Sequence, residues 1–419
     1  MEDKPTKRLS SCRLCFGAFF GQKLTLAPTP LANELNSKKE MALHAEVFPL
    51  NLVMCSACRH IQLEDIVSPV RLFSEYVYQS GTSLTFREHF QKLALKIVSF
   101  PLAENAKVLE IGSNDGILLK ALEEQGLQAF GLEPSALLVD KCRNDHLTVV
   151  EGYLDEHGIN EIRKLSPEVD VVIGNNVFAH IDDMNAAFEH VYSILIESGL
   201  FIFEVAHLLK LIEKGIFDTI YHEHMSYHSV FSLKIFLENK GFSIVDVGEI
   251  PTHGGSIRVI TRKGYLNEGP SASVTGIIKR EVDAGIIEPT IFSALAQQIS
   301  LLRDRIHEEL KDLSEYAIYG YGAPAKLVTF ISEIGLERLE ILAVVDDNLD
   351  KQGKFLPRSG FEIISSEIFE KLIQDSDRKI ACFIFPWNLG PEIMSKLKMM
   401  LPTGSRVVTF FPSVSSVRI

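Results

Sequence analysis

A short segment near the middle of the chain concentrates side chains that can move protons. Residues 221–228 read Tyr-His-Glu-His-Met-Ser-Tyr-His, which is three histidines, two tyrosines and a glutamate within eight residues. Histidine titrates near neutral pH, a carboxylate can orient it, and a tyrosine hydroxyl can donate to a developing oxyanion. We therefore expect acid–base chemistry, with His224 as the base, Glu223 orienting it and Tyr221 donating to a substrate oxygen.

Other interpretations of this segment stay open. His224 and His228 lie four residues apart and could share a metal, although the His-Glu-x-x-His motif is absent. A polar helix start is a second interpretation, with Ser226 or Ser229 as its cap. His180 is a rival base, because it follows the end of another predicted strand.

A glycine-rich loop follows the apolar run Val108–Ile111. The stretch from Gly112 to Gly116 lies between that predicted strand and a predicted helix, as in a doubly wound α/β nucleotide site. Its spacing is G-x-x-x-G, not the G-x-G-x-x-G that aims a helix at a pyrophosphate. Glu133 ends the next predicted strand, where an acid can accept both hydroxyls of a ribose. Loop and acid together favour S-adenosylmethionine (SAM) over a nicotinamide dinucleotide, with an ordinary βα turn as the alternative.

The expected cofactor site extends to residues on both sides of this loop. Ligands of parallel sheets bind beyond the carboxyl ends of the strands, and two asparagines follow the predicted strand Val169–Ile173. The complete expected set is Glu110, Gly112, Asn114, Gly116, Glu133, Asn175 and Asn176.

Cysteines form a further pattern near the N-terminus. Cys12-Arg-Leu-Cys15 and Cys55-Ser-Ala-Cys58 are two C-x-x-C pairs, which together supply four thiolates for one structural zinc. A redox motif or unpaired core cysteines are the alternatives, but redox C-x-x-C motifs rarely occur as a matched pair. The two remaining cysteines are isolated, and we expect them to be buried apolar residues.

Composition limits the class of protein. The 419 residues carry a net charge of −13, which argues against a general nucleic-acid binder because such a protein needs a basic face. We find no apolar run of membrane-spanning length and no signal-peptide core at the N-terminus. Paired cysteines that suit a metal rather than disulfides favour a reducing, cytoplasmic location.

Two α/β units and a small N-terminal module must position these residues. An amphipathic helix is predicted over residues 84–99, and long helices over 272–313 with a break at Pro289. We expect a zinc-binding domain at 1–70, a SAM domain at 71–265 and a Rossmann-like domain at 266–419. The predicted strands are Val108–Ile111, Ala129–Leu132, Val169–Ile173, Leu200–Val205, Ser243–Val247, Ser256–Thr261, Tyr316–Tyr319, Leu339–Val345, Lys379–Phe385 and Arg406–Phe411.

Several segments could contact a second ligand. The loop from Gly320 to Lys326 precedes a helix, whose N-terminal N–H groups attract phosphate. Trp387 could stack on a base or serve only in packing, and Arg258 could bind phosphate or be a solvated side chain. The tyrosine-rich segment 73–83 suits either a lid over the ligand or a hydrogen-bonded linker.

Nearly the whole chain resembles the SAM-dependent nucleotide-sugar C-methyltransferases of deoxysugar biosynthesis. Tyr221-His-Glu-His224 and Gly320-Tyr-Gly-Ala-Pro-Ala-Lys326 are the most specific matching stretches. In this family the first zinc knuckle has Cys followed directly by Gly, whereas this chain has Cys15-Phe-Gly. The other matching stretches are Pro30–Asn33, Tyr76–Ser80, Glu110–Gly116, Asn175–His180, Gly254–Arg258, Asp346–Gly353 and Pro386–Asn388.

The resemblance implies a class I SAM-methyltransferase domain between a zinc-binding module and a C-terminal Rossmann-like domain that holds the nucleotide. It implies methylation at C3 of a nucleotide-linked (dTDP or GDP) 4-keto-6-deoxyhexose through an enediolate, with Tyr221, Glu223, His224, His180 and Tyr76 in the catalytic step. The implied substrate-binding residues are Tyr78, Ser80, His228, Arg258, Tyr321, Lys326, Asp347, Trp387 and Asn388.

Two other classes of function compete with this one. A nicotinamide-dependent nucleotide-sugar oxidoreductase would use the same fold, but neither glycine loop has the dinucleotide spacing. A non-catalytic protein that binds SAM or a nucleotide sugar would not need the Tyr-x-Glu-His cluster. We expect a monomer or a small homo-oligomer with no nucleic-acid or membrane partner.

Overall fold

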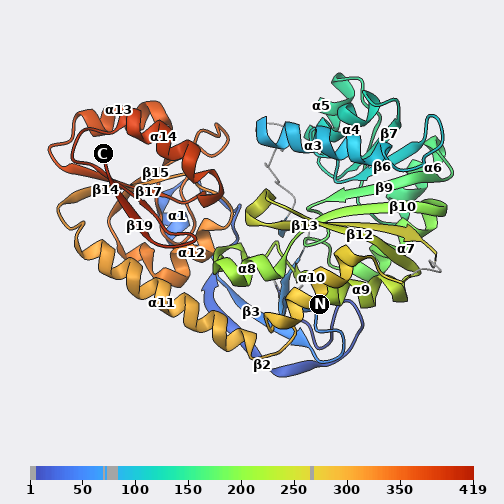
Figure 1. Ribbon diagram of the computed structural model, residues 1–419. Helices are drawn as coiled ribbons and strands as arrows, with labels where there is room; N and C mark the ends of the chain where they lie inside the picture. Colours follow the sequence, from blue (N-terminus) through green and yellow to red (C-terminus); the bar gives the residue numbers. More distant parts are fainter. Residues whose placement is uncertain (1–5, 69–70, 73–83, 265–268) are drawn as a thin grey trace.

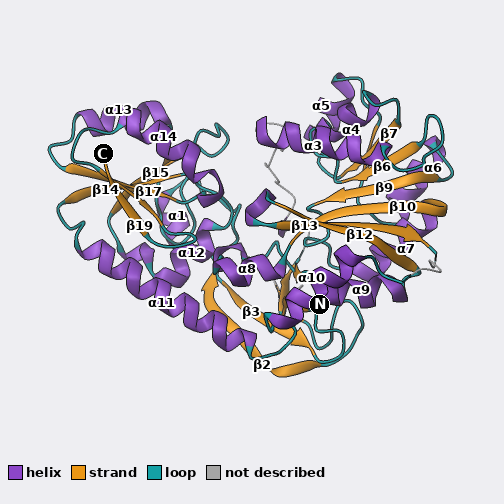
Figure 2. Cartoon of the chain, viewed as in Figure 1, coloured by secondary structure: helices purple, strands orange, loops and turns teal. Residues whose placement is uncertain are grey.

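The computed structural model describes residues 6–68, 71–72, 84–264 and 269–419, which form two α/β lobes joined by a smaller module. Figure 1 shows the lobe with the early strands β6–β10 at the right and the C-terminal lobe at the left. Strands β2 and β3 of the N-terminal module lie below and between them. Figure 2 shows the strands of each lobe layered against helices.

The first lobe is built on a seven-stranded sheet with the order β12-β13-β10-β9-β6-β7-β8. Strand β13 runs antiparallel to both of its neighbours, whereas the pairs from β10 to β8 are parallel. This arrangement confirms the predicted doubly wound α/β class. The bounds are β6 Lys107–Ile111, β7 Gln128–Glu133, β8 Val149–Glu151, β9 Val169–Asn175, β10 Leu195–Ala206, β12 Phe242–Ile250 and β13 Ser256–Lys263.

Alternating apolar side chains bury both faces of this sheet. Val171 and Ile173 enter the core on one face, while Val172 between them enters the core on the other. Each fully buried side chain of this size contributes about 1.5–3 kcal/mol. The covering helices are α3 Leu84–Val98, α4 Ile117–Glu123, α5 Ala136–Asn144, α6 Glu156–Leu165, α7 Met184–Ile194, α9 Val230–Asn239 and α10 Ala272–Asp283. Helix α8 (Leu208–Lys214) instead packs in the core that the module shares with the C-terminal lobe.

The N-terminal module is an antiparallel sheet that a piece of the first lobe completes. β2 (Phe19–Thr29), β3 (Phe48–Cys55) and β4 (Ile61–Leu63) pair in sequence order, and β11 (Ser226–Tyr227) adds to β4. The smaller elements are β1 Thr6–Arg8, paired with β5 Asp65–Val67, and α1 Lys39–Leu43. The histidine-rich segment is therefore part of two structural units.

The C-terminal lobe is a second α/β unit with the strand order β16-β15-β14-β17-β18-β19. All pairs are parallel except the last. Its strands are β14 Tyr316–Tyr321, β15 Ile341–Val345, β16 Ile363–Ile364, β17 Lys379–Ile384, β18 Arg406–Thr409 and β19 Ser415–Arg418. Its helices are α11 Ile291–Lys311, α12 Leu327–Ile334, α13 Ser366–Gln374 and α14 Gly390–Met400.

In the sheets of the two lobes, the structure adds three strands to those predicted. β8 and β16 are three and two residues long, and β19 is exposed along its whole length, so none carries a strong hydrophobic pattern. The helical region breaks where Pro289 predicts, because α10 ends at Asp283 and α11 begins at Ile291. Among the described residues, helices that combine the length and the hydropathy needed to cross a bilayer are absent.

Candidate active site

The glycine-rich loop between β6 and α4, residues 112–116, which we call the cradle loop, has a left-handed backbone at both ends. Gly112 and Gly116 have φ angles of 64° and 74°, a region that favours glycine. A Cβ atom on Gly116 would lie 2.3 Å from Leu147 Cδ1, so a larger residue would displace the packing beneath the loop. The Gly112 N–H donates to the Leu132 carbonyl at 2.8 Å, which ties the loop to β7.

Glu133 is fixed at the end of β7 by backbone donors. Its carboxylate accepts from the Asn114 N–H and from the Ser135 N–H, both at 2.9 Å. Burial raises the pKa of Glu133, and these two bonds oppose the rise. The acid that the sequence singled out thus lies directly against the cradle loop, where it can accept ribose hydroxyls.

Glu110 adds a second buried acid beneath the cradle loop. Burial, followed by the nearby charge of Glu133, raises the pKa of Glu110 well above its usual range, while the Asn175 amide opposes this. Its Oε2 atom has no hydrogen-bond partner in the described part of the chain. A buried polar atom without a partner is costly, so the residues here fit a polar and cationic ligand such as SAM.

The segment 217–228, which we call the site loop, contains a hydrogen-bonded pair that defines a histidine tautomer. His224 Nδ1 lies 2.9 Å from the Thr219 carbonyl oxygen, which only accepts, so Nδ1 carries the proton. Nε2 therefore accepts from the Tyr221 hydroxyl, also at 2.9 Å. Burial holds the pKa of His224 well below its usual value. The ring is thus neutral, with the lone pair of a base on Nε2.

The interpretation that Glu223 orients His224 is wrong, because the Thr219 carbonyl and Tyr221 hold the ring. The Glu223 carboxylate instead accepts from Asn33 Nδ2 at 2.6 Å, and burial raises its pKa to about 7. His180 lies beside His224 with ring centroids 5.0 Å apart. Burial lowers the pKa of His180 to about 4, and a bond to the Glu223 backbone opposes this shift.

Three parts of the chain hold the site loop in place. From the C-terminal lobe, Thr329 Oγ1 donates to the Ile220 carbonyl at 2.7 Å. From the N-terminal module, the Leu63 N–H donates to the Met225 carbonyl at 3.0 Å, while the Met225 N–H donates to Ala179 of the first lobe. The site loop is therefore the meeting point of both lobes and the module.

The four paired cysteines converge as the sequence predicts. Their sulfur atoms all lie within 4.8 Å of one another, with Cys12 and Cys58 3.6 Å apart and Cys15 and Cys55 3.4 Å apart. Tetrahedral zinc–thiolate bonds of about 2.3 Å require sulfur atoms at about this separation. The four residues therefore fit a closed structural zinc site.

Comparison with known proteins follows the three parts of the fold. Models of a zinc binding domain, a methyltransferase domain and a C-methyltransferase C-terminal domain match residues 12–73, 85–247 and 251–412. The C-methyltransferase NovU of Streptomyces niveus is 30% identical over 408 residues, which is 96% of each chain. This chain belongs to that C-methyltransferase family.

Solved structures resemble parts of this C-methyltransferase. Magnesium protoporphyrin IX methyltransferase of Synechocystis PCC 6803, solved with bound SAH, is 16% identical at a TM-score of 0.36, over 47% of this chain and 93% of that one. A SAM-dependent methyltransferase of Clostridium acetobutylicum ATCC 824 is 15% identical with a TM-score of 0.36, and the match covers 43% of this chain and 92% of that one.

The family membership and the strand order establish three points. The first lobe of this C-methyltransferase is a class I SAM-methyltransferase domain, the cofactor is SAM, and the N-terminal module binds zinc. The enzyme transfers a methyl group to carbon.

A glycine loop in the C-terminal lobe of the C-methyltransferase has the same backbone hydrogen-bond pattern as the cradle loop. The Gly322 N–H donates to the Val345 carbonyl, and Asp346 accepts from the Ala323 and Asn348 N–H groups at 2.8 and 2.9 Å. Asp346 thus corresponds to Glu133. Asp347, the neighbouring residue predicted to bind substrate, instead accepts from Ser366 at 2.6 Å and pairs with Lys396 at 2.9 Å.

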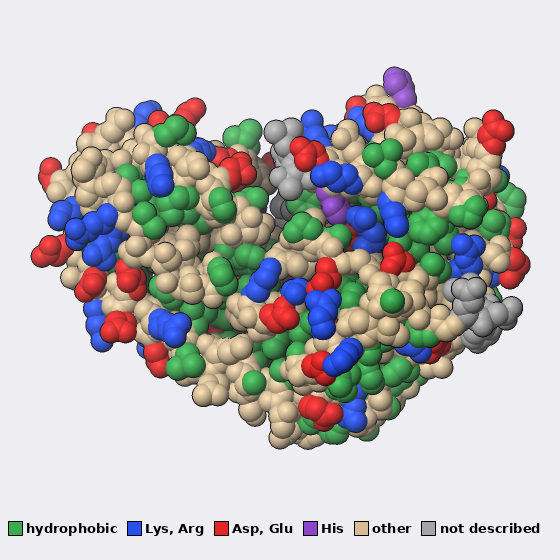
Figure 3. Space-filling view, in the orientation of Figure 1, with side chains coloured by type: hydrophobic (Ala, Val, Ile, Leu, Met, Phe, Trp, Pro, Cys, Tyr) green, Lys and Arg blue, Asp and Glu red, His purple; other side chains and the backbone are tan. Residues whose placement is uncertain are grey.

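The two loops differ in charge. In place of the acidic Glu110, the C-terminal lobe has Gly320, where a Cβ atom would lie 2.4 Å from Phe385. Lys351 Nζ donates to the Ala323 carbonyl at 2.8 Å within the second loop. Figure 3 shows the two lobes facing one another across a hollow in the surface. Glu110 thus adds a buried acid beside the first loop, whereas Lys351 beside the second is paired with Asp346 at 3.5 Å.

Lys326 and Trp387 form part of the contact between lobes. Lys326 Nζ lies 3.5 Å from the Trp387 ring centroid and donates to Asn388 Oδ1 at 3.1 Å. Trp387 Nε1 donates to Asp218 at 2.7 Å, and its ring edge packs against Gly254. These contacts support the packing interpretation of Trp387. Burial lowers the pKa of Lys326 to about 8, and the Asp218 charge opposes this shift.

Other predicted substrate residues have partners within the protein. Arg258 forms an ion pair at 2.6 Å with Glu204, which His89 of α3 also contacts at 2.7 Å. His228 is buried, with Nε2 3.2 Å from the Phe178 carbonyl oxygen, and Tyr321 hydroxyl lies 3.4 Å from Asp347. Tyr76, Tyr78 and Ser80 lie outside the described residues.

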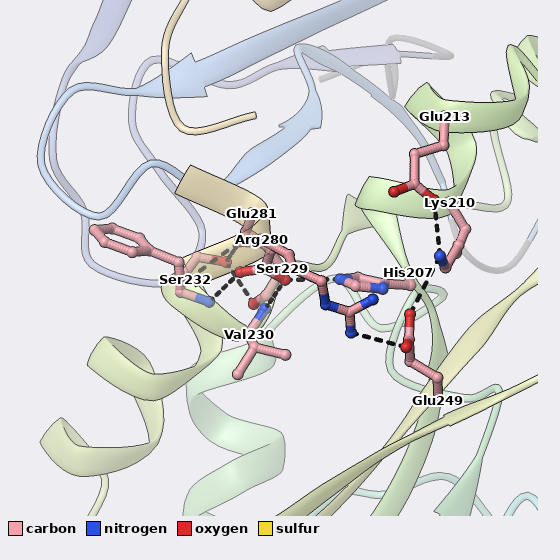
Figure 4. A network of polar contacts seen from close by, with 10 residues as sticks. His207, Lys210, Glu213, Ser229, Val230, Ser232, Glu249, Arg280 and Glu281 are labelled. Atoms are coloured by element: carbon pink, nitrogen blue, oxygen red, sulfur yellow. Dashed lines mark hydrogen bonds and ion pairs between the residues drawn. The ribbon is translucent and has the colours of Figure 1, made fainter. Parts of the chain in front are cut away.

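A buried acid that is absent from the predicted site anchors the end of the site loop. Glu281 of α10 accepts from His207 Nε2 at 2.7 Å and from the Val230 and Phe231 N–H groups at the start of α9. Figure 4 shows Glu281 between His207 and this helix start, with Ser229 beside it. Both Glu281 and His207 are almost fully buried. The sequence does carry one indication of this role, because Glu281 lies on the apolar face of a predicted helix.

Proposed function

We propose that this C-methyltransferase methylates C3 of a nucleotide-linked 4-keto-6-deoxyhexose, carried on dTDP or GDP. The observation that carries the proposal is the Tyr221–His224 pair, in which a buried neutral histidine presents a basic nitrogen to a phenol. Methylation at carbon needs a carbon nucleophile, and an adjacent ketone acidifies the C–H bond that must be broken. The site loop lies between the lobe for SAM and the C-terminal lobe, to which we assign the nucleotide.

In this proposal the Tyr221 hydroxyl turns from His224 Nε2 to the C4 oxygen when the sugar binds. Nε2 is then free to remove the C3 proton, and Tyr221 donates to the C4 oxygen as negative charge develops there. Because burial keeps His224 neutral, the base form is present at every pH near neutrality. SAM, when bound, supplies an electrophilic methyl group. His180 remains the rival base, since its ring packs against His224.

The ligands divide between the lobes. Glu110, Asn114, Glu133, Asn175 and Asn176 hold SAM together with the two glycines of the cradle loop. The nucleotide contacts the C-terminal lobe, where Lys326 lies near the contact between lobes. We keep the division into a zinc module (1–70), a SAM domain (71–265) and a nucleotide domain (266–419) as part of the same proposal.

The test is methyl transfer to defined sugars. The enzyme is incubated with SAM and a panel of dTDP-, GDP- and UDP-linked 4-keto-6-deoxysugars, and the products are examined by mass spectrometry. We expect one sugar to gain the mass of one methyl group, placed at C3 by NMR. Methylation of none of them, by enzyme that binds S-adenosylhomocysteine (SAH), would refute the proposed substrate class.

A further inference from the structure

The N-terminal module reaches the site loop through the segment that follows β2. Ala32 packs in a small apolar cluster with Tyr221 and with Val328 of the C-terminal lobe. The Asn36 N–H donates to the Phe355 carbonyl at 3.0 Å, which ties the same segment to that lobe. Between these two contacts, Asn33 donates its amide to the Glu223 carboxylate at 2.6 Å.

Glu223 sits among groups that do not balance its charge. Its side chain is almost fully buried, and the ionisable neighbours on its own loop are Tyr221, His222 and His224. From the neighbouring 177–180 turn, the His180 ring bonds to the Glu223 backbone. Burial lowers the pKa of His180 and His222 to about 4 and that of His224 further below its usual value, so all three rings are neutral. From the N-terminal module, Asn33 reaches the carboxylate itself, while Ala32 and Val328 pack against the nearby Tyr221.

Asn33 is therefore the group that supports the ionised form of Glu223. It is the one side chain among the described residues that donates to this carboxylate, and its bond goes to Oε1. The bond opposes the effect of burial on the pKa of Glu223. The second oxygen, Oε2, accepts from no side chain in the described ranges, so it keeps its capacity to accept a hydrogen bond from a ligand.

We propose that Asn33, a residue of the zinc module, is a positioning residue for catalysis. Its amide fixes the Glu223 carboxylate so that Glu223 Oε2 accepts a hydrogen bond from a hydroxyl of the sugar substrate. This inference rests on the proposed function. It explains why a module that binds zinc far along the chain from the SAM site is joined to a methyltransferase. The module completes the substrate site as well as supporting the fold.

The consequence for pH dependence has a definite sign. Asn33 stabilises the carboxylate, so its removal raises the pKa of Glu223 above about 7 and leaves less of the ionised form at neutral pH. For Asn33→Ala we expect a KM for the sugar that is about 10- to 100-fold higher at pH 7, as for loss of a charged hydrogen bond. The KM should recover as the pH rises, while the SAH dissociation constant and the zinc content stay unchanged.

An exchange of the Asn33 and Glu223 side chains distinguishes a role in positioning the carboxylate from a structural contact between the domains. In the double variant Asn33→Asp with Glu223→Gln, the amide and the carboxylate change places, so the bond between module and loop is restored. We expect its melting temperature to return to that of the wild type while its KM for the sugar stays raised. Asn36→Ala, in the same segment, is the matched control and should keep the wild-type KM, since among described residues the Asn36 side chain donates only to the nearby Glu34 carbonyl.

Two results would overturn the inference. The first is a double variant with wild-type KM, which would reduce the pair to a structural contact. The second needs no substrate: 13C NMR of carboxyl-labelled glutamate, with Glu223→Gln assigning the signal, should show Glu223 titrating at higher pH in Asn33→Ala. An unchanged titration would remove Asn33 from its role whether or not the proposed sugar is the substrate.

Discussion

The cradle loop and the site loop differ in how much of the chain is needed to build them. The cradle loop takes its form from two neighbouring strands, with Glu133 bonded to backbone groups 2 and 19 residues away in the same lobe. The site loop is held by Thr329 of the C-terminal lobe and by the N-terminal module, through Asn33 and the β4–β11 pairing. Cofactor binding is thus a local property of one lobe, whereas catalysis depends on all three parts.

This difference predicts that changes in the N-terminal module or the C-terminal lobe will impair turnover and leave SAM affinity intact. Changes in the cradle loop should do the reverse. Each variant below is therefore measured twice, once for turnover and once for SAH binding by calorimetry.

The largest effect is expected from removal of a zinc ligand. Structural zinc in small modules contributes roughly 10 kcal/mol or more to folding. Cys55→Ser should abolish stoichiometric zinc and turnover, because the module no longer supports β11 and the site loop. Elemental analysis and SAH calorimetry on the same sample provide the measurement, and we expect SAH affinity within about a factor of two.

Cys382→Ala is the control for this variant, since Cys382 is a buried thiol of the C-terminal lobe outside the cluster. It should retain zinc. If Cys55→Ser keeps full turnover without zinc, the module does not support the site loop.

A smaller effect is expected from Glu133→Ala, which should weaken SAH binding rather than turnover. The change removes the acceptor for the ribose and a charged hydrogen bond, which is worth about 1.5–3 kcal/mol. The SAH dissociation constant should rise roughly tenfold or more. Turnover at saturating SAM should change far less. Asp140→Ala, at an exposed position on α5, is the control, and an SAH affinity equal to that of the wild type in Glu133→Ala would remove Glu133 from the site.

The smallest effect is expected from Thr329→Val in the C-terminal lobe. Valine keeps the shape of threonine but removes the bond to the Ile220 carbonyl, and an unsatisfied buried acceptor costs about 1–3 kcal/mol. We expect a lower melting temperature and a several-fold lower turnover, with unchanged SAH affinity. Thr275→Val, on the exposed face of α10, is the comparison. A loss of SAH affinity equal to the loss of turnover would show that the two loops are not independent.

The same contrast explains what the sequence could predict. The cradle loop, Glu133 and the cysteine pairs were predictable because a turn, a strand end and a C-x-x-C knuckle are each local patterns. The partners of the site loop were not. Nothing local links Asn33 to Glu223 across 190 positions, and Glu223 was assigned to the wrong neighbour for that reason.

Long-range contacts also account for the residues whose predicted partners differ from the structure. Arg258 is paired with Glu204, which precedes it by 54 positions, and Trp387 bonds to Asp218 from the other lobe. A charged or aromatic residue beside a glycine turn looks the same in sequence whether it faces a ligand or another strand.

The central claim is that the site loop removes a proton from carbon independently of methyl transfer. Enzyme, nucleotide-linked 4-keto sugar and SAH are incubated in D2O, and deuterium at C3 is followed by NMR. The wild type should exchange this proton without methylation, and His224→Asn should be slower by about 100- to 10,000-fold, as for loss of a general base, with SAH binding unchanged. Exchange at the wild-type rate in His224→Asn, together with its loss in His180→Asn, would contradict the account and make His180 the base.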